Sequence, residues 1–192
     1  MIIGLTGSSG SGKTTISNIF KEHGYYIINA DEIAHNITST DDACIQEITD
    51  EFGSKYIDQN GCLKRRELGE LVFSDSQKLS RLNEILHPKI IFQIKSKINL
   101  SNSEYILIDA PLLIQSGADF LCDKIIAVVA DDDLKLKRIT ERDNISEKQA
   151  KNRLFSQPAN KYYTNVANYV IINNNTIDDI KNQVIKIINK FF

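Results

Sequence analysis

The stretch Met1–Thr15, MIIGLTGSSGSGKTT, decides the fold of this chain. It begins with the apolar run IIGL, which is typical of a buried parallel strand. The run leads into GSSGSGKT, residues 7–14, which matches the phosphate-loop pattern G-x-x-x-x-G-K-S/T. Ile16, Ile19 and Phe20 then follow at helical spacing. Because strand, glycine-rich loop and helix occur in the order that a phosphate loop requires, the sequence predicts a nucleotide phosphate site.

The residue types of this loop suit phosphate binding. Its three glycines allow the backbone to approach a ligand closely, so that consecutive N–H groups point at phosphate oxygens. The Lys13 ammonium is expected to reach the β- and γ-phosphates, and the Thr14 hydroxyl to bind Mg²⁺. A Gly/Ser linker is the alternative, but a buried strand and an amphipathic helix do not flank a linker. We assign the phosphate site to Ser8, Ser9, Gly10, Ser11, Gly12, Lys13, Thr14 and Thr15.

Composition limits the class of protein. The 192 residues suffice for one core with insertions. The 23 basic and 25 acidic residues give a net charge of −2, which excludes a basic nucleic-acid binder. The sequence shows no membrane-length apolar run and no signal-peptide pattern, so we expect a cytoplasmic protein without membrane or nucleic-acid partners. The three cysteines form no C-x-x-C pair, so neither a disulfide framework nor a zinc site is predicted.

Four further apolar runs predict buried strands, and helical patterns separate them. The runs are residues 25–29, 105–109, 124–129 and 169–172, and a closing amphipathic helix is predicted over 177–188. Alternating strands and helices predict an α/β fold with a doubly wound parallel sheet. We expect a single domain with a doubly wound core (about 1–31, 100–131 and 165–192) and two helical insertions (about 32–99 and about 132–164).

Two carboxylates follow predicted strands. Asp109 ends the strand Tyr105–Asp109, which is the form of the element that helps to hold Mg²⁺ in phosphate-loop proteins. Asp31 follows the strand that ends at Asn29, at the edge of the sheet where ligands bind. From its residue type alone, Asp31 is better interpreted as a helix N-cap.

The region between the second and third strands is helical and polar. Asn60-Gly61 predicts a tight turn, and Arg65 follows it in a basic run at an expected helix start, where positive charge opposes the helix dipole. His87 precedes Pro88, which we place at a helix N-terminus or a kink, so that His87 marks an element boundary. Alone, His87 is more simply structural.

A basic helical pair follows the fourth strand. The acidic run at residues 131–133 is expected to start its first helix, and Ser146…Gln149 forms a capping-box signature at the second. Arg138, Arg142 and Arg153 lie in this pair. Such an arrangement suits a mobile lid that closes over a triphosphate.

Several of these segments, taken together, resemble the dephospho-CoA kinase family. They are GLTGSSGSGKT, NADEIAH, NGCLKRRELGELVF, LNEILHPKI, LIDAPLLIQSG and RDNISEKQAKNRLFSQ, with ANYVIINNNT after them, and they cover nearly the whole chain in the family's order. The phosphate loop is shared by many kinases, whereas the Asp31 segment, the His87-Pro88 pair and Asp109-x-Pro-Leu-Leu are more particular. The resemblance implies a single phosphate-loop kinase domain, in which residues 32–99 are a helical substrate-binding insertion and residues 132–164 a lid. It also implies transfer of the γ-phosphoryl of ATP to the 3′-hydroxyl of the dephospho-CoA ribose, the last step of coenzyme A biosynthesis.

The resemblance also implies residue roles. Asp31 matches the carboxylate that deprotonates the ribose hydroxyl, so the general base becomes the favoured interpretation over the cap. Arg65 and His87 match positions near the acceptor. Arg142 and Arg153 match lid arginines that would neutralise the charge developing on the transferred group, and Arg153 is also assigned to substrate binding. The catalytic residues are thus expected to be Asp31, Lys13 and Arg142, and the Mg²⁺ ligands Thr14 and Asp109. The contacts with ATP are expected to come from the phosphate loop, Arg142, Asn173 and Asn174. A monomer is assumed.

This chain departs from the family pattern at Gln115, where Glu is usual, at Asn175, where Gly is common, and at Ser8-Ser9. Two rival functions stay open at this point. One is a kinase for a nucleoside, nucleotide or shikimate-like alcohol. The other is a nucleotide-dependent switch, although the guanine-reading pattern N-K-x-D does not occur.

Overall fold

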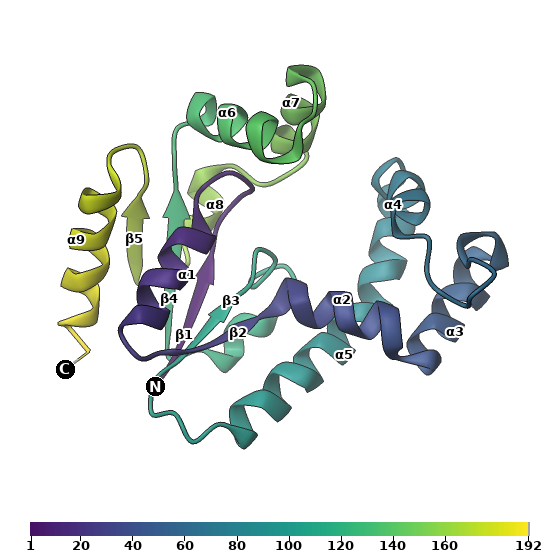
Figure 1. Cartoon of the computed structure of the whole chain (residues 1–192), viewed down its shortest axis with the longest axis horizontal. Coiled ribbons are helices and arrows are strands. Elements are labelled where there is room, and N and C mark those ends of the chain that lie inside the picture. The colour runs from purple at the N-terminus through teal and green to yellow at the C-terminus, as the bar shows by residue number, and fades with distance from the viewer. Residues whose placement is uncertain (192) are drawn as a thin grey trace. The chain divides into compact units, whose positions relative to one another are not determined.

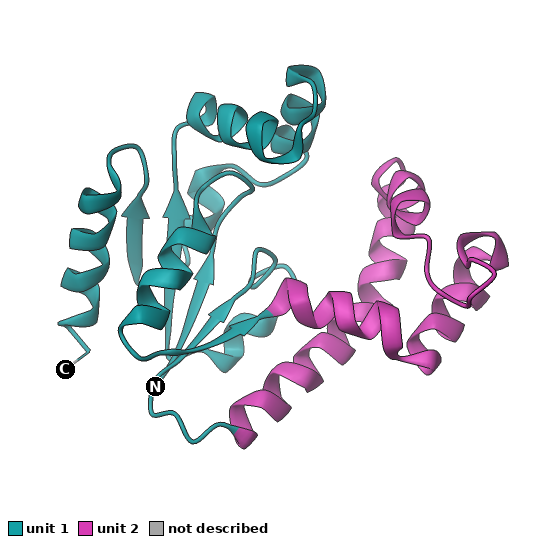
Figure 2. Ribbon diagram, in the orientation of Figure 1, with its two compact units in different colours: residues 1–29, 101–192 teal, residues 30–100 magenta. Residues whose placement is uncertain are grey.

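A computed structural model describes residues 1–191 of the chain. The chain forms two compact units (Figure 2). The first comprises residues 1–29 together with the chain from residue 101 onward, and the second comprises residues 30–100. The phosphate loop and the segment predicted as a lid belong to the first unit, and the whole predicted substrate-binding insertion, residues 32–99, belongs to the second.

The first unit is built on a parallel sheet of five strands in the order β2-β3-β1-β4-β5 (Figure 1). The strands are β1 (Ile2–Thr6), β2 (Tyr26–Asn29), β3 (Ile106–Asp109), β4 (Lys124–Val129) and β5 (Tyr169–Ile172). All five predicted strands are therefore confirmed, with boundaries that differ by at most one residue. The doubly wound parallel sheet is confirmed with them, because each crossover is long enough to hold helices.

Helices α1 (Lys13–Glu22) and α9 (Ile177–Ile188) cover one face of this sheet (Figure 1). Their apolar residues form one cluster with the inward side chains of the strands: Ile3, Leu5, Ile16, Ile19, Phe20, Leu107, Ile126, Val128, Ile171, Ile180, Val184, Ile187 and Ile188. A Cβ at Gly4 on β1 would meet Leu113 and Cys122, so these two residues pack closely on β1. This packing fixes β1 and α1, and hence the two ends of the phosphate loop.

Three helices lie between β4 and β5: α6 (Asp132–Asp143), α7 (Glu147–Phe155) and α8 (Asn160–Thr164). The acidic run begins α6 as predicted, with Asp131 at its N-cap. The capping box at Ser146 and Gln149 is also confirmed at the start of α7. Ile139, Ala150 and Leu154 form a small buried cluster that joins α6 to α7.

The second unit is helical. It contains α2 (Ala30–Thr40), α3 (Asp42–Phe52), the short 3₁₀ helix η1 (Ser54–Tyr56), α4 (Arg65–Phe73) and α5 (Ser76–Leu100). The long α5 packs against α2, α3 and α4. The predicted turn at Asn60-Gly61 is confirmed, since Gly61 has a φ of +78° and the flanking residues Ile57 and Leu63 form an antiparallel bridge.

Helix α5 runs without a break through Pro88. The prediction that His87 marks an element boundary is therefore wrong. Proline removes one backbone N–H and normally weakens a helix interior. Here the packing of α5 on three other helices outweighs that local cost. No helix among residues 1–191 is long and apolar enough to cross a membrane.

Gly12 combines a positive φ with a close neighbour. Its φ is +96°, and a Cβ there would lie 1.9 Å from Asn173 Nδ2. Gly24 has a similar φ of +86° with nothing within 4 Å of its Cβ position. We expect Gly24→Ala to lower the free energy of unfolding by about 1 kcal/mol through backbone strain alone. Gly12→Ala should lower it further and abolish nucleotide binding, as urea denaturation and ATP titration would measure. Equal losses in the two variants would contradict a steric role for Asn173.

Candidate active site

The phosphate loop lies between the carboxyl end of β1 and the first residue of α1. Gly12 precedes Lys13 in the left-handed conformation and begins the helix. The Lys13 ammonium folds back over the loop and donates to the carbonyl oxygens of Gly7 (2.7 Å) and Ser8 (3.3 Å). The loop therefore already has the closed shape of a phosphate cradle, with its cation held at the cradle by carbonyl oxygens.

A carboxylate lies beside this loop. Asp109 is the last residue of β3 and is 8% exposed. It pairs in register with Leu5 of β1 on one side and with Asn29 of β2 on the other. Since Leu5 lies two residues before Gly7, the sheet places Asp109 next to the start of the phosphate loop.

Thr14 and Asp109 form a donor set that fits Mg²⁺. Thr14 is exposed on the first turn of α1, and the buried carboxylate of Asp109 ends the neighbouring strand. A hydroxyl and one carboxylate, completed by waters and phosphate oxygens, are the ligands that Mg²⁺ prefers in phosphate-loop sites. No cluster of three or more His, Cys, Asp or Glu with metal-binding geometry occurs in residues 1–191.

Asn173 supports the phosphate loop from behind. It is 4% exposed, and its Nδ2 donates to the Ser11 carbonyl over 2.7 Å. Arg138 of α6 donates to the Asn173 carbonyl (3.0 Å), to Asn173 Oδ1 (3.2 Å) and to the Gly10 carbonyl (3.3 Å). These contacts tie the loop both to the residue after β5 and to α6. Sequence reasoning assigned Asn173 to ATP and gave it no part in shaping the loop.

Asn174 makes a different contact. Its Oδ1 accepts from the Asp131 N–H over 2.9 Å, at the N-cap of α6. The two neighbouring asparagines therefore hold two different segments, one the phosphate loop and one the start of α6.

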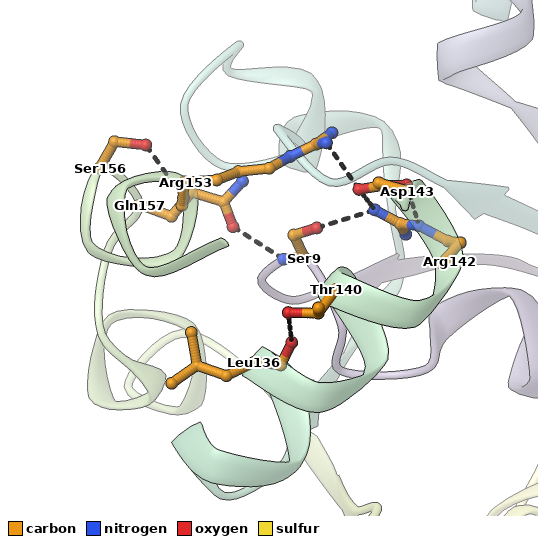
Figure 3. A network of polar contacts seen from close by, with 8 residues as sticks. All are labelled: Ser9, Leu136, Thr140, Arg142, Asp143, Arg153, Ser156 and Gln157. Atoms are coloured by element: carbon orange, nitrogen blue, oxygen red, sulfur yellow. Dashed lines mark hydrogen bonds and ion pairs between the residues drawn. The ribbon is translucent and has the colours of Figure 1, made fainter. Parts of the chain in front are cut away.

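Two arginines of the segment predicted as a lid, Arg142 and Arg153, share one carboxylate (Figure 3). Arg142 donates to Asp143 through Nε (2.7 Å) and Nη2 (2.9 Å), and Arg153 Nη1 donates to Asp143 Oδ2 (2.7 Å). The hydrogen bond from Arg142 holds the pKa of the Asp143 carboxyl below its usual value, and the same bond raises the pKa of Arg142. Both arginines are about half exposed, so these ion pairs exchange readily for a better anion.

Ser9 connects the phosphate loop to α6 and to the chain that follows α7 (Figure 3). Its Oγ accepts from Arg142 Nη2 over 3.2 Å, and its backbone N–H donates to Gln157 Oε1 over 2.7 Å. Gln157 follows α7, so the loop is tied to the end of α7 as well as to α6. The sequence gave no signal for Gln157 beyond its place in a family motif.

In the second unit, Asp31 is the second residue of α2. It lies inside the first turn, where a carboxylate suits the helix dipole, two residues past Asn29, the position at which a cap would stand. Arg65, the first residue of α4, is bonded to α2: its guanidinium contacts His35 Nδ1, the His35 carbonyl and Thr38 Oγ1. Burial lowers the pKa of Arg65. The contact with His35 was not predicted, although both residues lie in family motifs.

His87 lies in the middle of α5. Its Nε2 is buried and has no hydrogen-bond partner, and burial lowers the pKa of the imidazole. A neutral imidazole with one uncommitted ring nitrogen can bind a hydroxyl or a phosphate oxygen at low desolvation cost.

Gln115, the position that departs from the family pattern, has a defined partner. Its side chain hydrogen-bonds to Tyr163 of α8, a tyrosine whose pKa is raised chiefly by burial. Here the amide links the chain that leaves β3 to α8, at the end of the segment predicted as a lid.

The two asparagines after β5 permit a matched test. In Asn173→Asp, the Ser11 carbonyl loses its donor and faces a carboxylate, so we expect the dissociation constant for ATP to rise about tenfold. Asn174→Asp keeps the oxygen that accepts from Asp131, so its affinity should stay within about twofold. Isothermal titration with ATP would measure both. Equal weakening in both variants would favour direct contacts of both amides with the nucleotide.

Burial of His87 predicts a pH dependence of stability. The folded state resists protonation of this imidazole, whereas the unfolded chain takes up the proton near pH 6.5. The stabilising contribution is thus complete above about pH 6.5 and is lost as the pH falls toward the lowered pKa. Replacing His87 by Leu should reduce the loss of unfolding free energy between pH 7 and pH 5, as urea denaturation would show. Identical curves for the wild type and the His87→Leu variant would contradict the burial argument.

Comparison with known proteins agrees with this geometry. A family model described as dephospho-CoA kinase matches residues 1–179. A dephospho-CoA kinase from Fusobacterium nucleatum is 41% identical over 184 residues, which cover 96% of this chain and 95% of that protein. Among solved structures, a dephospho-CoA kinase from Campylobacter jejuni is 30% identical and superimposes with a TM-score of 0.72, covering 99% of this chain and 96% of that one.

The TT1252 protein from Thermus thermophilus shares the fold, with a TM-score of 0.86 at 23% identity over 100% of this chain and 97% of that one. Family model, relatives and site geometry lead to one conclusion: this chain belongs to the dephospho-CoA kinase family, ATP-dependent kinases of the last step of coenzyme A biosynthesis.

Proposed function

We propose that this chain transfers the γ-phosphoryl group of ATP to the 3′-hydroxyl of the dephospho-CoA ribose, giving coenzyme A and ADP. The observation that carries the proposal is the pre-shaped phosphate loop, with the Lys13 ammonium at its cradle and the Asp109 carboxylate in register beside it. That arrangement suits phosphoryl transfer, in which the protein mainly positions the groups and neutralises charge.

On the donor side, Lys13 exchanges the Gly7 and Ser8 carbonyls for the β- and γ-phosphate oxygens. Arg142 and Arg153 exchange the Asp143 carboxylate for the transferring group in the same way, since a phosphate carries more charge than one carboxylate. Both changes put cations on oxygens where negative charge develops in the transition state.

Mg²⁺ is the proposed metal, held by Thr14 and Asp109. When bound, the ion neutralises the β- and γ-oxygens and orients the triphosphate. The adenine end of ATP is placed near the turn that contains Asn173 and Asn174. Because Asn173 is committed to Ser11 and Arg138, the backbone of this turn is the better candidate for base contacts.

On the acceptor side, Asp31 is the proposed general base. Asp31 comes two residues after Asn29, which pairs in register with Asp109 in the sheet. Two peptide units limit the Cα–Cα distance between Asn29 and Asp31 to about 7.6 Å. The Asp31 carboxylate takes the proton of the 3′-hydroxyl while the hydroxyl oxygen forms a bond to the γ-phosphorus. The bond between the γ-phosphorus and the β,γ-bridging oxygen breaks, and ADP is released. Arg65 and His87 are proposed to bind the acceptor. A cytoplasmic location is proposed because the reaction consumes ATP, and a monomer is assumed.

The activity is tested by ADP production from MgATP with and without dephospho-CoA. We expect ADP release only with the acceptor, and a product heavier by one phosphoryl group in the mass spectrum. ATP binding without turnover of dephospho-CoA would retain the phosphate site and overturn the acceptor.

Asp31→Asn tests the general base. Loss of the proton acceptor should lower kcat by about a hundredfold or more, while KM for ATP changes little. Glu32→Gln removes the neighbouring carboxylate of the same helical turn and should keep kcat close to the wild-type value. If Asp31→Asn raises KM for ATP and leaves kcat unchanged, the carboxylate is structural.

A further inference from the structure

A second lysine lies beneath the phosphate loop. Lys135, in the first turns of α6, is 2% exposed, although lysine side chains are seldom fully buried. Its Nζ contacts Asp132 Oδ1 (2.7 Å), Asn160 Oδ1 (3.0 Å) and Ser8 Oγ (3.5 Å). Each of the three ammonium protons therefore has an oxygen to donate to, which a buried ammonium requires.

The three partners of Lys135 come from three segments. Ser8 belongs to the phosphate loop, Asp132 to the start of α6 and Asn160 to the start of α8. Backbone packing supports the same junction, since a Cβ at Gly10 would lie 2.7 Å from the Lys135 carbonyl oxygen. One ammonium group thus joins the loop to the first helix and the last helix of the segment between β4 and β5.

The charge of Lys135 is expected to add little to the stability of the fold. Its ionic partner Asp132 has a side chain that is 61% exposed, so the pair gains little in water. Burying the ammonium carries a desolvation cost, and an apolar side chain of similar length often gives equal or greater stability at such a position. Because the buried ammonium lies next to a loop that binds a polyanion, we look for its role in that loop.

Ser8 is held by two lysines in this structure. Lys13 Nζ contacts its carbonyl at 3.3 Å, and Lys135 Nζ contacts its hydroxyl. Lys13 leaves the carbonyl when it binds the phosphates of a nucleotide. Lys135 is buried, and its contacts with Asp132 and Asn160 do not involve the phosphate loop, so we expect it to keep them when a nucleotide binds.

We infer that Lys135 is a positioning residue for nucleotide binding: it holds Ser8, and through Ser8 the phosphate loop, in the shape that receives the β- and γ-phosphates. It acts through the loop and touches no substrate. The inference rests on the nucleotide half of the proposed function and is independent of the acceptor.

Lys135→Met tests this inference, because methionine fills similar space without charge or donors. We expect KM for ATP and the dissociation constant for ADP to rise about tenfold, the cost of losing a charged hydrogen bond in the loop. KM for dephospho-CoA and kcat at saturating ATP should stay within about twofold. The melting temperature should stay close to that of the wild type.

Lys137→Met is the matched control. It makes the same change of charge two residues away on α6, at a side chain that is 71% exposed and 4.0 Å from Glu141. ADP affinity in this variant should equal that of the wild type. Equal ADP affinity in both variants would overturn the inference, and so would a parallel rise of both KM values with a lowered melting temperature.

A double-mutant cycle with Ser8→Ala tests the route of the effect. If Lys135 acts through the Ser8 hydroxyl, Lys135→Met should weaken ADP binding less in the Ser8→Ala background than in the wild type. Full additivity would overturn this route. If Lys135→Met does not fold, Ser8→Ala alone decides: several-fold weaker ADP binding supports the inference, and unchanged binding overturns it. Calorimetric titration with ADP needs no acceptor, so failure of the proposed reaction leaves these measurements interpretable.

Discussion

The hydrogen bond from the buried Asn173 amide to the Ser11 carbonyl constrains the rest of the nucleotide site. It brings the chain that leaves β5 so close to the phosphate loop that residue 12 has no room for a side chain. Arg138 reaches the same asparagine and the Gly10 carbonyl from α6. The loop between β1 and α1 is thus shaped by segments more than 120 residues away in the sequence, which explains how a glycine-rich stretch keeps a defined form.

Charge in the nucleotide site divides into fixed and exchangeable parts. Lys135 is 2% exposed and is bonded to Ser8, Asp132 and Asn160, and Arg138 is bonded to the Gly10 and Asn173 carbonyls, so we count both cations as fixed. Lys13, Arg142 and Arg153 are bonded to carbonyls or to the partly exposed Asp143, partners that a triphosphate can replace. A kinase needs both kinds of cation, because a preformed cradle lowers the cost of binding and exchangeable cations respond to the charge that develops during transfer.

Local sequence patterns predicted the elements well. Each strand was an apolar run that ended at a polar or turn residue, and the phosphate loop has a composition that other structures seldom share. The capping box and the acidic helix start were confirmed because their signals act over three or four residues. The boundary at His87 was wrong, since the cost of Pro88 within a helix is local, whereas the packing that offsets it comes from α2, α3 and α4.

The sequence by itself determined the parallel α/β fold, the phosphate loop and the family, since all three depend on periodicity and on motifs in a fixed order. Only the tertiary structure decided what Asn173 and Lys135 do. Lys135 and Lys137 stand on the same polar helix, and positions two apart point to nearly opposite sides of it. The sequence shows that the two lysines face different ways, but which of them is buried depends on where α6 packs, and that is set by the phosphate loop at the other end of the chain.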